Sequence, residues 1–149
     1  ELTLYQNPDL TNLNISNLPN LSELIIDQNY TLASLDISNF NSLSNLIIDN
    51  NNNLTSINVS ELPNLQSLII QNNENLMSIS EFSGLSNVDS LSIFGNTSLE
   101  NMTFSGLQNL SYLLFGNNSY IQYFPDLSAL QNLIYLQVSG NFGITSLEI

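Results

Sequence analysis

The fold is decided by the stretch Leu65-Gln-Ser-Leu68-Ile-Ile70-Gln-Asn-Asn73-Glu-Asn-Leu76. It has the pattern of a short strand, with apolar residues at alternate positions, that runs into an asparagine and a further leucine. The asparagine recurs in steps of 22 or 23 residues, at Asn7, Asn29, Asn51, Asn73, Asn96, Asn118 and Asn141. A fixed period of this length predicts a solenoid in which each repeat forms one coil.

The recurring asparagine is predicted to have a structural role. Where a strand ends and the chain turns over the core, backbone N–H and C=O groups lose their sheet partners, at a cost of about 1–3 kcal/mol each if they stay unpaired. An asparagine amide both donates and accepts hydrogen bonds. Stacked from coil to coil, the seven side chains are expected to satisfy these backbone groups and one another.

The positions before each asparagine predict parallel strands, with pairs such as Leu24/Ile26 and Leu68/Ile70 pointing inward. On the opposite side, Leu13/Ile15, Leu35/Ile37 and Ile57/Val59 suggest a short second strand. A serine column is expected to cap short 3₁₀ turns there, and a third column to bond each turn back into the sheet. The serine column is Ser16, Ser38, Ser60, Ser83, Ser105 and Ser128, and the third column is Asn20, Ser42, Asn64, Asn87, Asn109 and Asn132. Two repeats carry one extra residue, expected to leave the strand register intact.

The pattern L-x-x-L-x-L-x-x-N-x-x-L, repeated in seven registers, resembles the leucine-rich repeat family and is similar to bacterial internalin-like surface repeats. The resemblance implies an α/β-type leucine-rich repeat solenoid, with a curved parallel β-sheet on its concave side. Short strands and 3₁₀ turns, with little true helix, are expected on the convex side. Residues 1–149 would form a single domain of about seven coils without recognisable caps, as in a fragment of a longer repeat array or a fibre subunit. The family implies a binding scaffold and not an enzyme.

The composition restricts the partners. The chain has 13 acidic residues and no Lys, Arg, His or Cys, giving a formal net charge of −13. Nucleic acid and anionic membrane surfaces should be repelled, and no apolar run is long enough for membrane insertion. Without histidine, cysteine, lysine or arginine, most arrangements of nucleophile and base are excluded.

The outward positions of the concave sheet form a candidate binding face. Isoleucines follow one another in adjacent coils, and aromatic residues flank them. The candidate residues are Ile25, Ile47, Ile69, Phe94, Tyr112, Leu114 and Tyr135. An exposed apolar stripe often marks an interaction site, although β-branched residues also simply suit a sheet surface.

Asp27 and Asp49 should lie one coil apart on the same face. They are candidates for a Ca²⁺ site, the one cofactor considered, with Asn50 and Gln28 as further oxygen ligands; the alternative is that they are solvated acids. Their separation also matches a retaining glycosidase pair, but that chemistry requires a cleft.

Glycosylation sequons occur at nine asparagines, of which Asn14 and Asn58 are the best candidates because they share an expected exposed column on the convex side. Asn29 and Asn96 should be buried in the ladder and inaccessible. A chain rich in Asn and Ser also generates such sequons by chance.

These features favour an extracellular or cell-surface binding or adhesion module that uses the concave sheet to hold a protein or glycan ligand. The alternative is a structural subunit of a glycosylated surface filament, assembled from copies of the chain end to end. A carboxylate glycosidase is a remote third reading.

Overall fold

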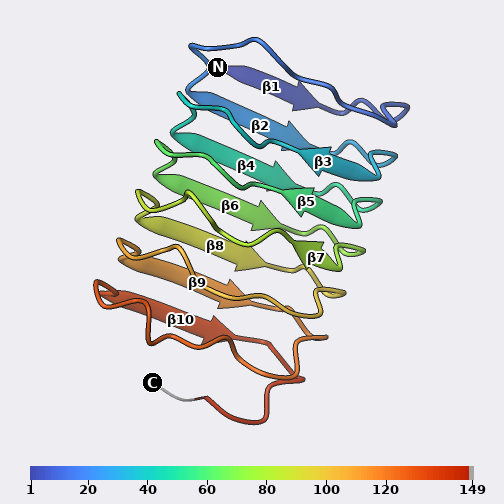
Figure 1. Cartoon of the computed structure of the whole chain (residues 1–149). Coiled ribbons are helices and arrows are strands. Elements are labelled where there is room, and N and C mark those ends of the chain that lie inside the picture. Colours follow the sequence, from blue (N-terminus) through green and yellow to red (C-terminus); the bar gives the residue numbers. More distant parts are fainter. Residues whose placement is uncertain (148–149) are drawn as a thin grey trace.

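The computed structural model describes residues 1–147, which form a stack of coils of about 22 residues each (Figure 1). Each coil contributes one strand to a parallel seven-stranded sheet with the order β1-β2-β4-β6-β8-β9-β10. The strands are β1 Leu2–Tyr5, β2 Glu23–Asp27, β4 Asn45–Asp49, β6 Ser67–Gln71, β8 Ser90–Phe94, β9 Tyr112–Gly116 and β10 Tyr135–Ser139. The predicted parallel solenoid is therefore present.

The strand register follows the repeat along the whole sheet. Leu24 pairs with Leu46, and Leu46 pairs with Leu68. The two 23-residue repeats leave this register intact, since Ile69 pairs with Ser92 across the first, and Leu114 with Gln137 across the second. The extra residues are accommodated outside the sheet, as predicted.

The core lies inside the coils and is built from alternate strand residues. In β2, β4 and β6, every second side chain is buried while its neighbours are partly exposed. Leu24, Ile26, Leu46 and Ile48 have no exposed surface. This alternation follows from the two-residue period of a strand and leaves one face of the sheet outward.

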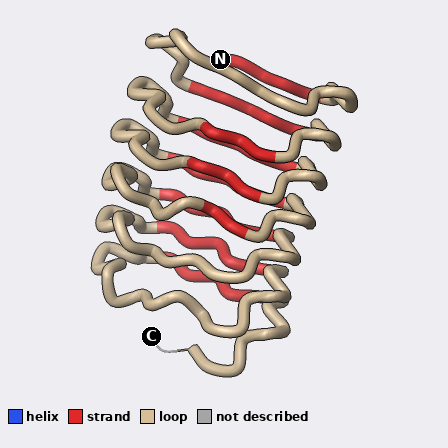
Figure 2. Tube along the Cα trace, turned by 45° about the vertical axis from the view of Figure 1, so that its right-hand side comes forward, coloured by secondary structure: helices blue, strands red, loops and turns tan. Residues whose placement is uncertain are grey.

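A three-stranded parallel sheet lies on the other side of the coils, formed by β3 Ser34–Asp36, β5 Ser56–Asn58 and β7 Ser78–Ile79 (Figure 2). The second strand expected at Leu13/Ile15 is not formed. Beyond β7 the sheet ends where the first extra residue enters. In the coils that follow, phenylalanines fill the interior, and Phe104 and Phe115 meet edge to face with ring centroids 6.2 Å apart.

Residues with positive φ bend the chain at the corners of each coil. One column immediately precedes the ladder asparagines and consists of Gln6, Gln28, Asn50, Asn72, Gly95, Asn117 and Gly140. The second column, on the other side, is Asn17, Asn39, Glu61, Gly84 and Gly106. Asparagine and glycine tolerate this left-handed conformation best, so each corner bends at one residue instead of requiring a longer loop.

The turns are simpler than expected. Residues 1–147 contain no helix and no 3₁₀ segment, so the expected 3₁₀ pieces were wrong. A single i to i+3 hydrogen bond closes each turn, as from Leu21 N–H to Leu18 O and from Leu65 N–H to Leu62 O. Pro19 occupies the second position of the first of these turns, where its fixed φ is favourable. No described helix is long and apolar enough to cross a membrane.

The predicted capping role of the serine column was also wrong. In the described residues no serine of that column accepts a backbone N–H. Instead, the residue two positions earlier caps the serine: Ser38 N–H donates to Asp36 Oδ1 at 3.0 Å, and Ser60 N–H donates to Asn58 Oδ1 at 3.2 Å. These are Asx turns, which a short carboxylate or amide forms more readily than a hydroxyl does.

The third column links coils to one another instead of linking a turn to the sheet. Asn87 Nδ2 donates to Pro63 O at 2.6 Å, and Asn109 Nδ2 donates to Ser86 O at 2.8 Å. Ser42, Asn64 and Asn132 donate to the preceding coil in the same way.

Candidate functional site

The asparagine ladder has the structural role that its spacing predicts. The five inner members, Asn29, Asn51, Asn73, Asn96 and Asn118, have no exposed surface, whereas Asn7 is exposed and Asn141 is partly buried. Asn51 Nδ2 donates to Asp49 O at 2.8 Å and to Ile26 O at 2.9 Å, and Asn51 Oδ1 accepts from Asn29 N–H at 3.0 Å. Within residues 1–147 no buried side-chain nitrogen or oxygen lacks a partner. These side chains are therefore fully used by the fold.

The outward face of the seven-stranded sheet carries three rows of side chains that run across the strands. The middle row is Thr3, Ile25, Ile47, Ile69, Ser92, Leu114 and Gln137. The row on its carboxyl side is Tyr5, Asp27, Asp49, Gln71, Phe94, Gly116 and Ser139, and the row on its amino side includes Tyr112 and Tyr135. The candidate binding residues thus share one face, as predicted. We call this surface the outer sheet face.

The aromatic residues of the outer sheet face gather on β9 and β10. Tyr112 and Tyr135 are 50% and 45% exposed, and their rings lie 6.2 Å apart with planes inclined by 32°. Tyr135 Oη donates to Gln137 Oε1 at 3.0 Å, so the ring is linked to a side chain of the same strand. Leu114, 37% exposed, belongs to the neighbouring row. These side chains form an apolar platform with polar edges.

Phe94 extends this platform by covering a glycine. A Cβ placed at Gly116 would meet the ring of Phe94 at 2.5 Å, so the ring lies directly on that backbone. This contact leaves Phe94 only partly exposed. Beside it, Gln71 Nε2 donates to Ser92 Oγ at 2.7 Å, and Ser92 is buried. The absence of a side chain at Gly116 therefore shapes the middle of the face.

At the other end of the face, the isoleucine row adjoins two carboxylates. Asp27 and Asp49 pair in register on β2 and β4, and both are partly exposed. Asn50 Nδ2 donates to Asp27 Oδ1 at 3.2 Å, and Asn72 Nδ2 donates to Asp49 Oδ1 at 2.9 Å. Asn50 thus presents its amide nitrogen to the carboxylate, where a cation ligand would present its oxygen.

The described residues contain no group of three or more Asp or Glu side chains placed to hold a metal ion. The expected Ca²⁺ site therefore has two carboxylates, one of which faces the NH₂ group of its expected amide ligand. Glycoside cleavage by a pair of carboxyl groups requires a cleft. Asp27 and Asp49 instead lie on the surface of a sheet and accept hydrogen bonds from neutral amides. This arrangement suits solvated acids.

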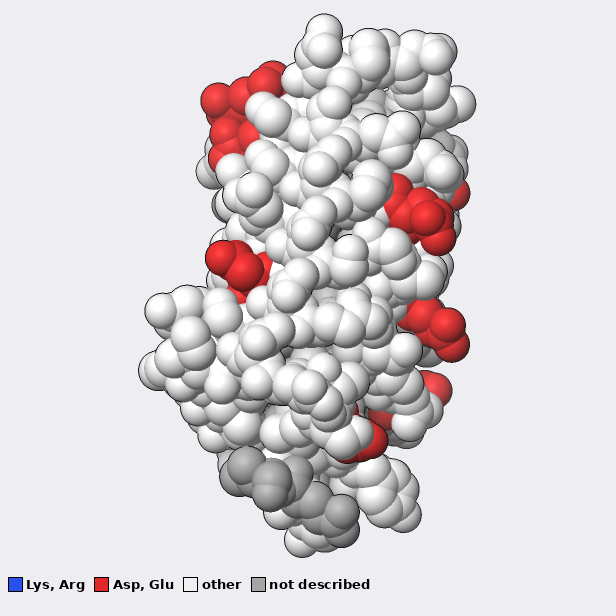
Figure 3. Space-filling view, turned by 60° about the vertical axis from the view of Figure 1, so that its left-hand side comes forward, with Lys and Arg blue, Asp and Glu red and all other residues white. Residues whose placement is uncertain are grey.

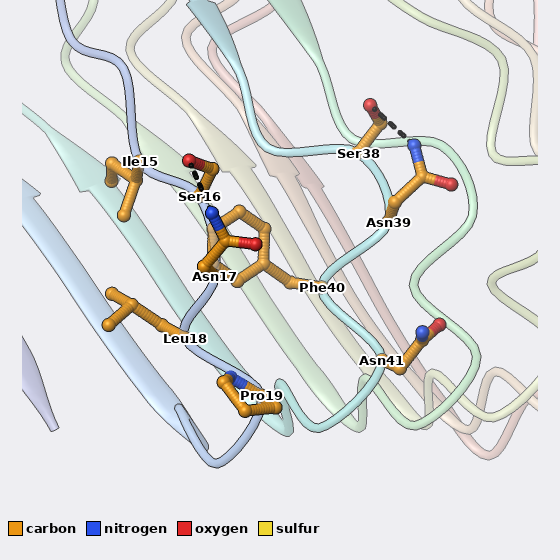
Figure 4. Close-up of a pocket in the computed structure, with 9 residues that line it drawn as sticks. All are labelled: Ile15, Ser16, Asn17, Leu18, Pro19, Ser38, Asn39, Phe40 and Asn41. Atoms are coloured by element: carbon orange, nitrogen blue, oxygen red, sulfur yellow. Dashed lines mark hydrogen bonds between the residues drawn. The ribbon is translucent and has the colours of Figure 1, made fainter.

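A hollow with a volume of about 570 Å³ lies off this face, between the first two coils (Figure 4). Ile15, Leu18 and Phe40 form its apolar wall. Two asparagine amides that line the hollow donate to the preceding serine: Asn17 Nδ2 donates to Ser16 Oγ at 3.4 Å, and Asn39 Nδ2 donates to Ser38 Oγ at 3.1 Å. No charged side chain lines it, so it offers little to orient a ligand.

The candidate sequons differ in their surroundings. Asn14 is exposed and lies outside any strand, whereas Asn58 is partly buried in β5 and its Nδ2 donates to Asp36 Oδ1 at 3.0 Å. The expectation that both share an exposed column was therefore wrong for Asn58. Asn29 and Asn96 are buried, as predicted.

Two carboxyl groups outside the seven-stranded sheet, those of Asp36 and Asp126, have lowered pKa values. The Ser38 backbone N–H is the main cause that lowers the pKa of Asp36, and the Ser38 hydroxyl and the Asn58 amide lower it further. The pKa of Asp126 is lowered in the same way by the Ser128 backbone N–H and hydroxyl. Hydrogen bonds from donors favour the charged form of a carboxyl group. The Asx turns thus account for both shifts.

On the face of the molecule shown in Figure 3, acidic side chains gather along two margins, with an uncharged strip between them. The sequence contains no Lys, Arg or His that could neutralise them.

No protein-family model, curated protein or solved structure matches this chain. Its function must therefore be argued from the geometry of its own surface.

Proposed function

We propose that this protein is a non-enzymatic binding or adhesion module of the leucine-rich repeat type, extracellular or at the cell surface, which binds its ligand on the outer sheet face. The observation that supports it most is the platform of Tyr112, Leu114 and Tyr135. Large exposed aromatic and aliphatic side chains that lie together on a rigid sheet are typical of interaction sites. Paired strands hold the platform in place, so little ordering is required when a ligand binds.

The repeat geometry supports the family assignment. Parallel strands recur every 22 or 23 residues, and each is followed by a ladder asparagine, which is buried in the five inner coils. Leucine-rich repeats build one strand per coil from this pattern. In such a scaffold the sheet is the concave binding surface, and we assign the same role to the outer sheet face.

A binding screen with matched variants tests this function. The purified protein is immobilised and exposed to a glycan array and to a panel of extracellular matrix proteins. The double variant Tyr112→Ser/Tyr135→Ser should lose any ligand that the wild type captures, because the platform is removed. The control Tyr120→Ser/Tyr123→Ser also removes two exposed tyrosines, 62% and 75% exposed, but from outside the sheet. Absence of any ligand, or equal capture by both variants, would refute the proposed site.

A further inference from the structure

We infer that the outer sheet face takes a cationic protein segment, in which Lys or Arg side chains alternate with apolar ones. The inference rests on the proposed function and names the chemistry of the partner. Three features of the face carry it: carboxylates that nothing in the chain neutralises, an apolar row beside them, and exposed aromatic rings.

The carboxylates of the face are available for a partner. Asp27 and Asp49 are each hydrogen-bonded through Oδ1 to a neutral amide, and no described residue donates to Oδ2 of either. Glu23 lies on the same strand as Asp27, on the other side of Ile25. Because the chain has no Lys, Arg or His, no side chain of the protein supplies the opposite charge, and a basic partner can do so.

The isoleucine row suits the stems of long basic side chains. Ile25, Ile47 and Ile69 lie directly across adjacent strands, about 4.8 Å apart. Lys and Arg pack their methylene stems on apolar surfaces while their charged heads stay at polar edges. A stem lying over Ile25 or Ile47 would bring its head toward the adjoining carboxylate row. One kind of side chain thus satisfies both rows.

The aromatic platform fits the same partner. Cations are attracted to the faces of tyrosine rings, and arginine is the most frequent cation in such contacts. Tyr112 and Tyr135 are inclined to each other and half-exposed, so their rings are accessible to a guanidinium group. Both ends of the outer sheet face therefore favour positive charge.

Other partners fit less well. An acidic surface would be repelled by the net charge of −13. A neutral apolar surface would cover Asp27 and Asp49 without pairing them, and burying an unpaired charge is costly. Charge complementarity thus distinguishes a cationic segment from both.

The test uses a fluorescent nine-residue peptide that alternates Lys and Leu, and a matched peptide with Gln in place of Lys. Binding to the purified chain is measured by fluorescence anisotropy in low and high salt. The lysine peptide should bind more tightly than the glutamine peptide, and added salt should weaken the binding of the lysine peptide. The double variant Asp27→Asn/Asp49→Asn should bind the lysine peptide about tenfold more weakly, since exposed ion pairs contribute about 0.2–1 kcal/mol each.

The control variant Glu81→Gln/Glu100→Gln changes the net charge by the same amount, at two exposed positions outside the seven-stranded sheet. It should weaken binding less than twofold. Equal loss in the two double variants, equal binding of the two peptides, or no binding of the lysine peptide would overturn the inference.

A further variant distinguishes a wrong partner class from a wrong proposed function. Ile25→Ser/Ile47→Ser removes apolar contact from the face and keeps its charge. If the two peptides bind equally and this variant abolishes their binding, the face is a binding site and only the partner class is wrong. If neither peptide depends on any residue of the face and the ligand screen also fails, the proposed function falls as well.

Discussion

Replacing Asn51 by alanine tests the reasoning about the ladder most directly. The side chain has no exposed surface and connects its own coil to the preceding one. Asn51→Ala removes the donor to Ile26 O and Asp49 O, and the acceptor of Asn29 N–H. It also removes the 3.3 Å hydrogen bond that Asn29 Nδ2 donates to Asn51 Oδ1. The change therefore leaves at least one buried N–H group without a partner.

The expected loss follows from these contacts. A buried backbone group left unpaired costs about 1–3 kcal/mol, and a further hydrogen bond contributes about 0.5–1.5 kcal/mol. Asn51→Ala should therefore lower the free energy of unfolding by about 3 kcal/mol, a large effect for one substitution. Urea denaturation followed by circular dichroism and tyrosine fluorescence measures it, and the chain has six tyrosines and no tryptophan to interfere.

Asn53→Ala is the matched control. Asn53 is exposed, and its Nδ2 donates one hydrogen bond, to Thr31 O at 3.2 Å. Its loss should cost about 0.5–1 kcal/mol, since water replaces an exposed hydrogen bond readily. Comparable losses in Asn51→Ala and Asn53→Ala would refute the assignment of the ladder as the element that satisfies the buried corner.

Asn51→Asp separates the two functions of the amide. It keeps an acceptor for the Asn29 N–H but turns a carboxylate oxygen toward the carbonyl groups that the amide nitrogen bonded. The variant should be less stable than wild type at neutral pH and recover part of the loss in acid, because a protonated carboxyl can donate. A loss that does not change with pH would mean that the donor role is unimportant.

Three further predictions concern other features. Gly106→Ala should lower the free energy of unfolding by about 2–4 kcal/mol, because φ is +97° there and the added Cβ would clash with Phe82 O; urea denaturation measures the loss, and a value below about 0.5 kcal/mol would contradict the prediction. Because the pKa of Asp36 is lowered in the fold, its stabilising hydrogen bonds are complete above the ordinary carboxyl pKa of 3.8 and weaken as pH falls through the lower folded value. Urea denaturation of Asp36→Ala and wild type should thus show a difference that shrinks below pH 3.8, and a constant difference would refute this. Added NaCl should raise the thermal midpoint, since side-chain charges can only repel one another here; a fall would show that this repulsion is not significant.

Much of the sheet was predictable because two periods act together. The two-residue period of a strand decides which side chains point inward, and the 22-residue period decides which of them become neighbours. Their combination placed Ile25, Ile47 and Ile69 in one row, and Asp27 beside Asp49, as the strand pairing confirms. Backbone geometry alone determines this arrangement, so no knowledge of side-chain conformation was needed.

The corners and turns were harder to predict because they depend on single residues. The Asn-Asn and Gly-Asn pairs at Asn50-Asn51 and Gly95-Asn96 do carry a signal, since asparagine and glycine favour positive φ. The pattern at the serine column was misleading. Serine and the preceding Asp36 or Asn58 can all cap a turn, and only the bend of the chain decides which side chain reaches an N–H group.

The surface detail of the candidate site also required the structure. That Tyr112 and Tyr135 lie close together follows from their register, but the inclination of their rings and the hydrogen bond from Tyr135 to Gln137 do not. That Phe94 lies on Gly116 follows from a contact between neighbouring strands within one row, which a single strand does not reveal. Rotamers depend on the shape of their neighbours, and a sequence pattern specifies only their direction.

The composition and the fold can be explained together. Ion pairs cannot link these coils, because every ionised side chain in the chain is negative. Neutral amides link the coils instead. The buried ladder amides join the coils at one corner. Exposed side chains such as Asn87 and Asn75 donate to carbonyl groups in the turns of the preceding coil. An amide contributes to such a stack without the desolvation cost of a buried ion. No ion pair is therefore needed to hold the coils together, and Asp27 and Asp49 on the outer sheet face, each bonded to an amide through Oδ1, keep Oδ2 for the proposed positively charged partner.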